Sequence, residues 1–275
     1  MANIISLMTD FGHQDQYVGV MKSVIINRNP VASIVDITHE IKPQNLNQAK
    51  FLTKCSYDYF PDMSVHLIVV DPDVGTDREI IILETSEAFF IAPDNGVLSQ
   101  VVQPYVCIDD KSCDSLIRPS GSCKLYALDQ EQYWNQPLSN TFHGRDIFAP
   151  VGALLARGEN PSQFGKLVSA MTYDPIPVPM VDKDFIEGEI IYVDHFGNLI
   201  SNIDSKYICR GKRLEINLGG LVITNLGETF NQEKGVGDFV ALIGSHDHLE
   251  ISIYKGDAAK TANIGEGTKI TVQYS

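Results

Sequence analysis

The chain has 275 residues, of which 44% are hydrophobic, and its 35 acidic and 21 basic residues give a formal net charge of -14. A chain of this length and composition buries one large core or two moderate ones. Such an acidic chain, with no cluster of lysines and arginines, would repel phosphate backbones, which argues against nucleic acid as a partner.

The first half of the chain alternates apolar runs of strand length with patterns of helical spacing. Taken in order, these patterns predict strands over 3–8 and 33–37, helices near 18–25 and over 45–60, a strand over 65–70, a hairpin of 79–84 with 88–92, and a helix over 147–157. The helix over 45–60 is expected to point Ala49, Leu52 and Phe60 inward. We therefore expect an α/β fold class for residues 1–172, an N-terminal α/β domain with a mostly parallel central sheet.

A proline-rich segment separates this half from the rest of the chain. Three prolines within five residues mark 173–184 as an extended linker. Beyond it the sequence predicts strands alone, over 188–193, 199–203, 213–218, 221–226, 238–243, 249–254 and 269–274. Short strands at regular spacing are typical of a small barrel or sandwich of about 90 residues. The sequence thus predicts a smaller C-terminal all-β domain over residues 185–275.

The N-terminus and the cysteines favour a cytoplasmic protein. No basic region precedes the first apolar run, which breaks at Asp10 and predicts a strand rather than a signal peptide. No apolar run approaches the roughly 20 residues needed to span a bilayer, so no membrane partner is expected. The cysteines are odd in number and form no CxxC pair, which favours reduced thiols over a disulfide framework or a zinc site. They are Cys55, Cys107, Cys113, Cys123 and Cys209.

Acidic residues directly follow predicted strands, where ligands bind in open α/β sheets. The densest polar cluster is the segment from Asp71 to Arg78. An aspartate leaving a buried strand and an arginine after a glycine-containing turn can form a carboxylate–guanidinium pair. A loop that is merely stabilised by this salt bridge is the simpler interpretation, and the segment alone favours it.

Three further turns carry candidate polar groups. His143 precedes a predicted helix and could act as a base or hydrogen-bond partner, although a solvated histidine beside a paired Arg145 and Asp146 is the simpler reading. Asn95, after Asp94, and Asn198, in the turn 194–198, could each pair with an adenine edge, although tight turns alone explain both segments. The absence of GxGxxG, Walker-type, HExxH and GxSxG motifs argues against dinucleotide, nucleoside-triphosphate, zincin and serine-hydrolase sites.

Taken together and in order, the motifs are much more specific than any one of them. They are TDFG at 9–12, YVGVMK at 17–22, DITH at 36–39, VVDPDVGTDR at 69–78, APDNGVL at 92–98, FHGRDIFAP at 142–150, DHFGNLISNI at 194–203 and LEISI at 249–253. This series resembles the S-adenosylmethionine hydroxide adenosyltransferase family, the SAM hydrolases, which are related to bacterial fluorinase and chlorinase. The resemblance runs from Thr9 to about Ala259, nearly the whole chain.

The resemblance implies an N-terminal α/β domain, a C-terminal β-barrel and a homotrimer. It further implies that S-adenosylmethionine lies between the first domain of one subunit and the second domain of its neighbour, and that water splits it into adenosine and methionine without a metal or an organic cofactor. The catalytic set of the hydroxide-using members corresponds to Asp71, Arg78 and His143. The corresponding substrate contacts are Asp10 for the ribose hydroxyls, Asn198 for adenine, and Asp194 and Ser245 for the methionine end. Asp94 and Asn95 are further candidate substrate contacts.

The chemistry needs an oxygen nucleophile held in line with the ribose 5′-carbon, in a dry site. We hypothesise that Arg78 and His143 orient the water and help to deprotonate it. A carboxylate paired with arginine is a poor base, so Asp71 is assigned positioning. Two departures from the family pattern are Asp73, where glycine is common, and the run 244–247, which replaces a more usual Asn-Ser-aromatic-Gly and affects the expected contact to the methionine carboxylate.

Two other functions fit the same motifs. A halide-using relative would use the same pocket, but those enzymes lack the Asp–Arg–His arrangement that this chain retains. A non-catalytic S-adenosylmethionine sensor would have lost a catalytic residue, and none is lost here. Hydrolysis is therefore the favoured prediction.

Overall fold

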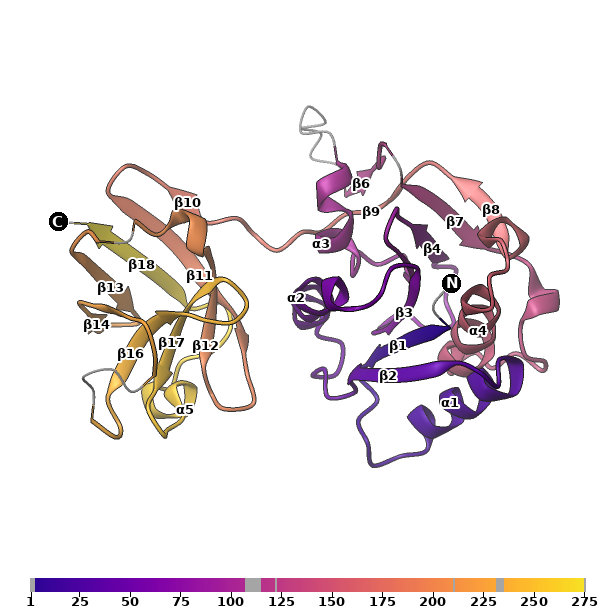
Figure 1. Ribbon diagram of the computed structural model, residues 1–275, viewed down its shortest axis with the longest axis horizontal. Helices are drawn as coiled ribbons and strands as arrows, with labels where there is room; N and C mark the ends of the chain where they lie inside the picture. The colour runs from indigo at the N-terminus through magenta and orange to yellow at the C-terminus, as the bar shows by residue number, and fades with distance from the viewer. Residues whose placement is uncertain (1–2, 107–114, 122, 210, 231–234, 275) are drawn as a thin grey trace. The chain divides into compact units, whose positions relative to one another are not determined.

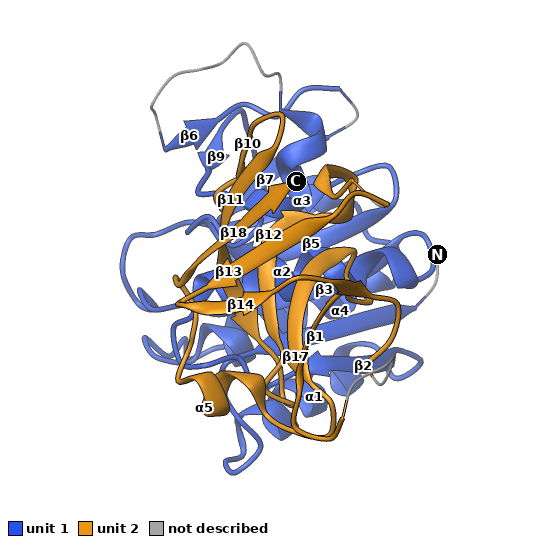
Figure 2. Cartoon of the chain, turned by 90° about the vertical axis from the view of Figure 1, so that its left-hand side faces the viewer, with its two compact units in different colours: residues 1–175 blue, residues 176–275 orange. Residues whose placement is uncertain are grey.

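The chain forms two compact units, Met1–Pro175 and Ile176–Ser275 (Figure 2). The structure, a computed structural model, describes residues 3–106, 115–121, 123–209, 211–230 and 235–274. Cys107 and Cys113 lie outside these ranges, whereas Cys55, Cys123 and Cys209 are free thiols. Burial raises the pKa of the Cys55 thiol to about 12, so this thiol stays protonated and unreactive at neutral pH.

The first unit is built on a seven-stranded sheet in the order β2-β1-β3-β5-β4-β7-β8 (Figure 1). Its strands are β1 Ile4–Thr9, β2 Ser33–Thr38, β3 Ser64–Val69, β4 Ile80–Glu84, β5 Ala88–Pro93, β7 Lys124–Leu128 and β8 Gly165–Val168. The pairs from β2 to β5 are parallel, and those from β5 to β8 are antiparallel. A two-stranded sheet of β6 Leu116–Ile117 and β9 Met171–Thr172 lies beside it. The predicted α/β fold with central parallel strands and a β4–β5 hairpin is confirmed.

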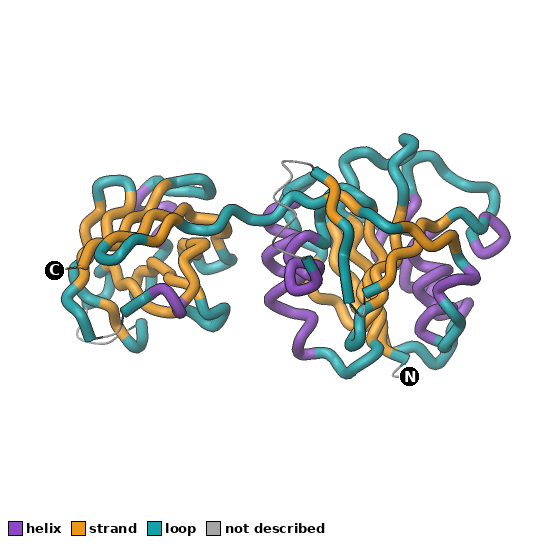
Figure 3. Tube along the Cα trace, turned by 90° about the horizontal axis from the view of Figure 1, so that it is seen from above, coloured by secondary structure: helices purple, strands orange, loops and turns teal. Residues whose placement is uncertain are grey.

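Helices flank both faces of this sheet (Figure 3). The α-helices are α1 Tyr17–Arg28, α2 Leu46–Ser56, α3 Ser99–Val102 and α4 Ala149–Ala156, and short 3-10 turns cover Tyr57–Tyr59, Gln103–Tyr105, Glu131–Tyr133 and Pro161–Gln163. The prediction of one helix over 45–60 is wrong at its end, because α2 stops at Ser56 and Phe60 is extended. Phe60 precedes Pro61, and a residue before proline is sterically disfavoured in the helical region.

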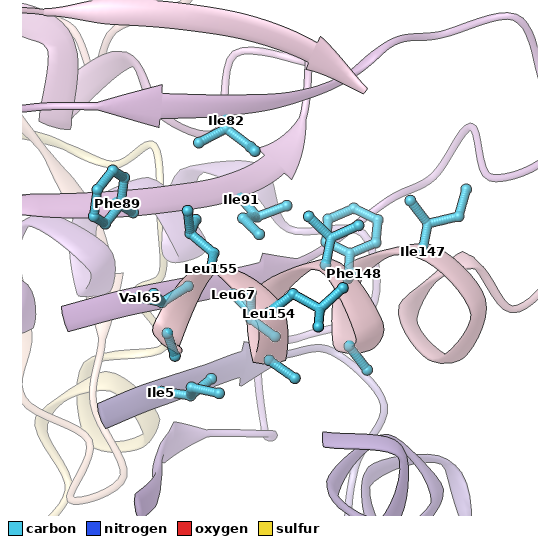
Figure 4. Packing of buried hydrophobic residues seen from close by; sticks show 14 of the residues in the cluster. Ile5, Val65, Leu67, Ile82, Phe89, Ile91, Ile147, Phe148, Leu154 and Leu155 are labelled. Atoms are coloured by element: carbon cyan, nitrogen blue, oxygen red, sulfur yellow. The ribbon is translucent and has the colours of Figure 1, made fainter. Parts of the chain in front are cut away.

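The two faces of the sheet carry separate apolar clusters. On one face, Phe148, Leu154 and Leu155 of the 147–156 segment lie over Val65 and Leu67 of β3 (Figure 4). On the other face, β3 and β5 pack against α2 and α3. β3 is buried at every position, as its continuous apolar run predicts. This central strand therefore holds Asp71, two residues beyond its end, at a fixed place on the sheet edge.

The second unit is a curled, mostly antiparallel sheet that carries the short helix α5 Ala258–Ala262 (Figure 3). Its strands are β10 Met180–Val181, β11 Phe185–Val193, β12 Leu199–Asp204, β13 Leu214–Leu218, β14 Leu221–Ile223, β15 Leu226–Gly227, β16 Phe239–Ile243, β17 His248–Ile253 and β18 Lys269–Tyr274, and a 3-10 turn covers Ser205–Tyr207. The predicted strand over 221–226 is split into β14 and β15, and β10 and α5 were not predicted. The expected all-β architecture is confirmed as a curled half-barrel around one apolar cluster. Within the described ranges, no helix is both long enough and apolar enough to cross a membrane.

Candidate active site

Three turns with acidic residues meet at one edge of the first sheet. Asp10 follows β1, Asp71 follows β3 and Asp94 follows β5. These three strands are parallel neighbours, so their carboxyl ends lie side by side. The edge is the place where α/β sheets bind ligands.

Arg78 holds Asp71 with two parallel hydrogen bonds. Its Nε donates to Oδ1 at 2.7 Å, and its Nη2 donates to Oδ2. The two side chains are only 10% and 5% exposed. The pair predicted from the sequence is thus a bidentate, largely desolvated ion pair, which fixes the plane of the guanidinium group.

His143 joins this pair from a distant part of the chain. Its Nδ1 lies 3.1 Å from Arg78 Nη2, and because arginine can only donate, Nδ1 must accept and the neutral ring carries its proton on Nε2. Burial lowers the pKa of His143, and the positive charge of Arg78 lowers it further. His143 is therefore neutral at neutral pH, with its one basic nitrogen turned toward the guanidinium.

The backbone after His143 forms a single π-helical turn, Gly144–Phe148, which leads into α4. Such π-bulges are frequent at functional sites because they displace a side chain from its regular helical direction. The expected pairing of Arg145 with Asp146 is confirmed, at 2.6 Å from Nε to Oδ1. The Asp146 carboxylate also accepts the Ser139 N–H and so anchors the loop that precedes His143.

Gly75 allows the two catalytic loops to touch. It has φ +83°, and a Cβ at this position would lie 2.2 Å from the carbonyl oxygen of Asn140. We expect Gly75→Ala to push the 71–78 loop away from the 140–143 segment and to lower kcat by roughly tenfold or more, because small misplacements of catalytic groups are costly. Gly121→Ala is the matched control, since Gly121 also has positive φ but nothing within 4 Å of its Cβ position. Steady-state kinetics of both variants would test this, and equal losses would contradict it.

Asp10 belongs to the same site. Burial raises its pKa, the backbone N–H of Gln44 donates to it at 2.9 Å and lowers the pKa, and the nearby charge of Asp71 raises it again. The next residue, Phe11, lies 3.4 Å from the position of a Cβ on Gly144. The structure therefore brings together Asp10, Asp71, Arg78 and His143, as the resemblance predicts.

The side chains of Asp94 and Asn95 are engaged by the backbone. Asp94 Oδ1 accepts the Thr172 N–H at 2.8 Å, and burial raises its pKa. Asn95 Nδ2 donates to the Val70 carbonyl at 3.0 Å, directly before Asp71. This turn thus links the end of β3 to the segment that leaves the first unit.

The remaining candidates lie in the second unit, in two adjacent turns. Asp194 accepts hydrogen bonds from Asn198, at 2.8 Å from its backbone N–H and 2.8 Å from its side-chain Nδ2. Ser245 is exposed in the 244–247 turn, where burial lowers the pKa of the neighbouring His246 while the charge of Asp194 raises it. The charge of Asp194 thus reaches the 244–247 turn. In the parts of the chain that the structure describes, no group of three His, Cys, Asp or Glu side chains could hold a metal ion.

The sequence analysis did not predict one contact near Asp10, although the histidine that makes it belongs to the DITH motif. Fully buried His39 contacts the Thr9 hydroxyl through Nδ1 at 2.9 Å. Strand periodicity places residues on faces but does not pair the ends of two neighbouring strands, so this contact emerges only from the fold.

The chain matches the SAM hydroxide adenosyltransferase N-terminal domain over residues 5–165 and the C-terminal domain of the same family over residues 188–271. A Methanocaldococcus jannaschii protein named (R)-S-adenosyl-L-methionine hydrolase is 32% identical, over 99% of this chain and 96% of its own length. A fluorinase from an Actinoplanes species is 24% identical over 98% of this chain and 97% of its own.

The crystal structure of an uncharacterized conserved protein from Thermotoga maritima superposes with a TM-score of 0.86 at 31% identity, covering 98% of this chain and 99% of that one. Both domains of one family are therefore present in order, with the predicted Asp–Arg–His cluster assembled in the first. The chain belongs to the SAM hydroxide adenosyltransferase family.

Proposed function

We propose that this protein hydrolyses (R)-S-adenosyl-L-methionine to adenosine and L-methionine, by attack of water or hydroxide on the ribose 5′-carbon. The observation that carries this proposal is the assembled Asp71–Arg78–His143 cluster, in a chain that shares both family domains with the hydrolases. The water oxygen forms the new bond to the ribose 5′-carbon, the sulfonium sulfur leaves with the electron pair of the broken carbon–sulfur bond, and the proton of the water passes to bulk solvent. Since this leaving group needs no acid catalyst, we propose a reaction without a metal or an organic cofactor.

We propose that His143 acts as a hydrogen-bond donor in that reaction. The sequence-based hypothesis gave His143 a share in deprotonating the water, but its only basic nitrogen, Nδ1, faces Arg78. We propose that Nε2–H donates to the nucleophilic oxygen, and that the arginine charge stabilises hydroxide over water there. Asp71 fixes the guanidinium and remains a positioning group.

The substrate contacts divide between the two units. We propose that Asp10 binds the ribose hydroxyls, Asn198 the adenine edge, and Asp194 with Ser245 the methionine end. Asp94 and Asn95 remain proposed substrate contacts, and their hydrogen bonds to the Thr172 N–H and the Val70 carbonyl fix the turn that carries them.

Oxygen-18 water with added chloride tests the reaction. Mass spectrometry of the products from S-adenosylmethionine should show adenosine labelled at the 5′-oxygen. A 5′-chloro product would instead identify a halogenase, the activity suggested by the more distant similarity to fluorinase. Tight binding without turnover would identify a sensor.

We further propose a cytoplasmic homotrimer in which each site combines the first unit of one subunit with the second unit of its neighbour. His143→Ala and Asp194→Ala damage different units and should each be inactive at low substrate concentration. Co-expressed in equal amounts, they should recover about one quarter of the wild-type sites, because a site needs one intact unit from each neighbour. Activity at the level of the single variants would contradict shared sites, and the mass in solution would test the trimer.

A further inference from the structure

His39 is a buried histidine without a part in the proposed chemistry. It is 0% exposed and follows β2, beside the turn 9–12 that carries Asp10. Its Nδ1 lies 2.9 Å from the hydroxyl of Thr9, which is itself fully buried. Its backbone carbonyl accepts the Gly12 N–H at 2.8 Å. One residue therefore holds both ends of the turn in which Asp10 lies.

The hydrogen positions in this contact follow from its neighbours. The Phe11 N–H donates to Thr9 Oγ1 at 3.2 Å, and because a carboxylate lies beside Nε2 and can only accept, Nδ1 is the nitrogen that accepts the Thr9 hydroxyl hydrogen. The ring proton then sits on Nε2, 3.1 Å from Asp36 Oδ1, although this N–H is poorly aligned with the oxygen. Burial lowers the pKa of His39 despite the opposing effect of Asp36, so the ring is neutral.

Asp36, which contacts His39, is itself held by an ion pair at the surface. Lys22 of α1 donates to Asp36 Oδ2 at 2.5 Å, and both side chains are about one third exposed. The contacts thus run from a surface ion pair, through a buried imidazole, to the hydroxyl at the start of the turn. On the opposite side, the Gln44 N–H holds the carboxylate of Asp10 directly. Asp10 is therefore held by two groups of contacts. Gln44 holds its carboxylate, and His39 holds the backbone of the turn through Thr9 and Gly12.

We propose that His39 is a positioning residue that orients Asp10 for the ribose hydroxyls of the substrate. This inference rests on the role of Asp10 in the proposed function. A carboxylate oxygen binds a vicinal diol only when the backbone presents it at hydrogen-bonding distance from both hydroxyls. Loss of the Thr9–His39 contact frees the turn, so the binding advantage of those hydroxyls is lost while the Asp71–Arg78–His143 cluster stays assembled.

Discrimination against deoxyribose substrates measures this role. The values of kcat/KM for S-adenosylmethionine and for its 2′-deoxy and 3′-deoxy analogues are compared. The wild-type protein should lose about 10- to 100-fold when a hydroxyl bound by a carboxylate is removed. In His39→Leu this discrimination should fall to about threefold or less, with a raised KM for S-adenosylmethionine.

Two amide variants distinguish the contact that His39 makes through Nδ1 from the contact that it makes through Nε2. His39→Asn keeps an acceptor near the Nδ1 position and should keep most of the discrimination. His39→Gln places its amide near the Nε2 position, toward Asp36, and should behave like His39→Leu. Equal behaviour of the two amides would overturn the assignment to the Thr9 contact.

His66→Leu is the matched control. His66 is 1% exposed, and its Nδ1 contacts the hydroxyl of Ser6, on the same strand as Thr9, at 2.6 Å. Both leucine variants remove a buried histidine–hydroxyl pair, so both should lower the thermal unfolding temperature, but only His39→Leu should change the discrimination. If the wild-type protein hydrolyses S-adenosylmethionine but His39→Leu discriminates against the deoxy analogues as strongly as wild type, the inference about His39 is overturned while the proposed function stands. Absence of turnover in the wild-type protein would refute the proposed function itself.

Discussion

Arg78→Met is expected to lower kcat by about a thousandfold or more, with a much smaller change in KM. The variant removes the cation that stabilises hydroxide and leaves the carboxylate of Asp71 desolvated without its partner. It also removes the donor that sets the tautomer of His143. Arg78→Lys should retain part of the activity, because it keeps the charge but loses the bidentate geometry. Rapid-mixing or steady-state assays of S-adenosylmethionine cleavage would measure both effects.

Arg145→Met is the control for that result. Arg145 also makes two parallel hydrogen bonds to an aspartate, Asp146, at 2.6 and 2.7 Å, two residues after His143. Its side chain is 35% exposed and pairs with Asp146 rather than with Asp71, so the variant should stay within about tenfold of wild type. A loss as large as that of Arg78→Met would mean that loop order, rather than the guanidinium charge, carries the effect.

His143→Ala should lower kcat by about 100- to 1,000-fold, the usual range for the loss of one preorganised hydrogen-bond donor to a reacting oxygen. Two amides test the donor role. His143→Gln can place an N–H near the Nε2 position and should retain more activity than His143→Asn, whose amide reaches only the Nδ1 position beside Arg78. If Nδ1 were instead the base, both amides would be as inactive as alanine.

The pH profile gives a second measurement on the same residue. Burial and Arg78 lower the pKa of His143 below its ordinary value of 6.5. Protonation would place a proton on Nδ1 opposite the guanidinium, so activity should be lost as the pH falls through this lowered pKa and should be present above it. The acid limb should disappear in His143→Gln. An acid limb that persists unchanged in that variant would assign the titration to another group.

Much of the architecture could be predicted from the sequence because it depends on local spacing. The apolar run of 65–70 gives a strand covered on both faces, and β3 is buried throughout. The change from alternating elements to strands alone separates the α/β sheet from the curled sheet. The end of α2 was predicted too late, since the helical spacing continues to Phe60 while Pro61 forces that residue into the extended region.

The candidate site was found from ordered motifs, whereas its working geometry depends on contacts between distant residues. Sequence spacing brings Asp71 and Arg78 into one loop, but only the fold brings His143 to Arg78 from 65 residues away and turns its basic nitrogen toward the guanidinium. Likewise, only the fold shows that Asp94 and Asn95 make hydrogen bonds to the backbone at Thr172 and Val70, while their predicted contact with the substrate stays a prediction.

The amino-acid sequence alone determined the two-part architecture and the set of chemical groups, because periodicity and motif order are local properties. The tertiary structure decided which nitrogen of His143 carries its proton, which acids are engaged by the backbone, and that His39 holds the turn of Asp10. These features depend on the directions of hydrogen bonds between residues far apart in the chain, which no local pattern encodes.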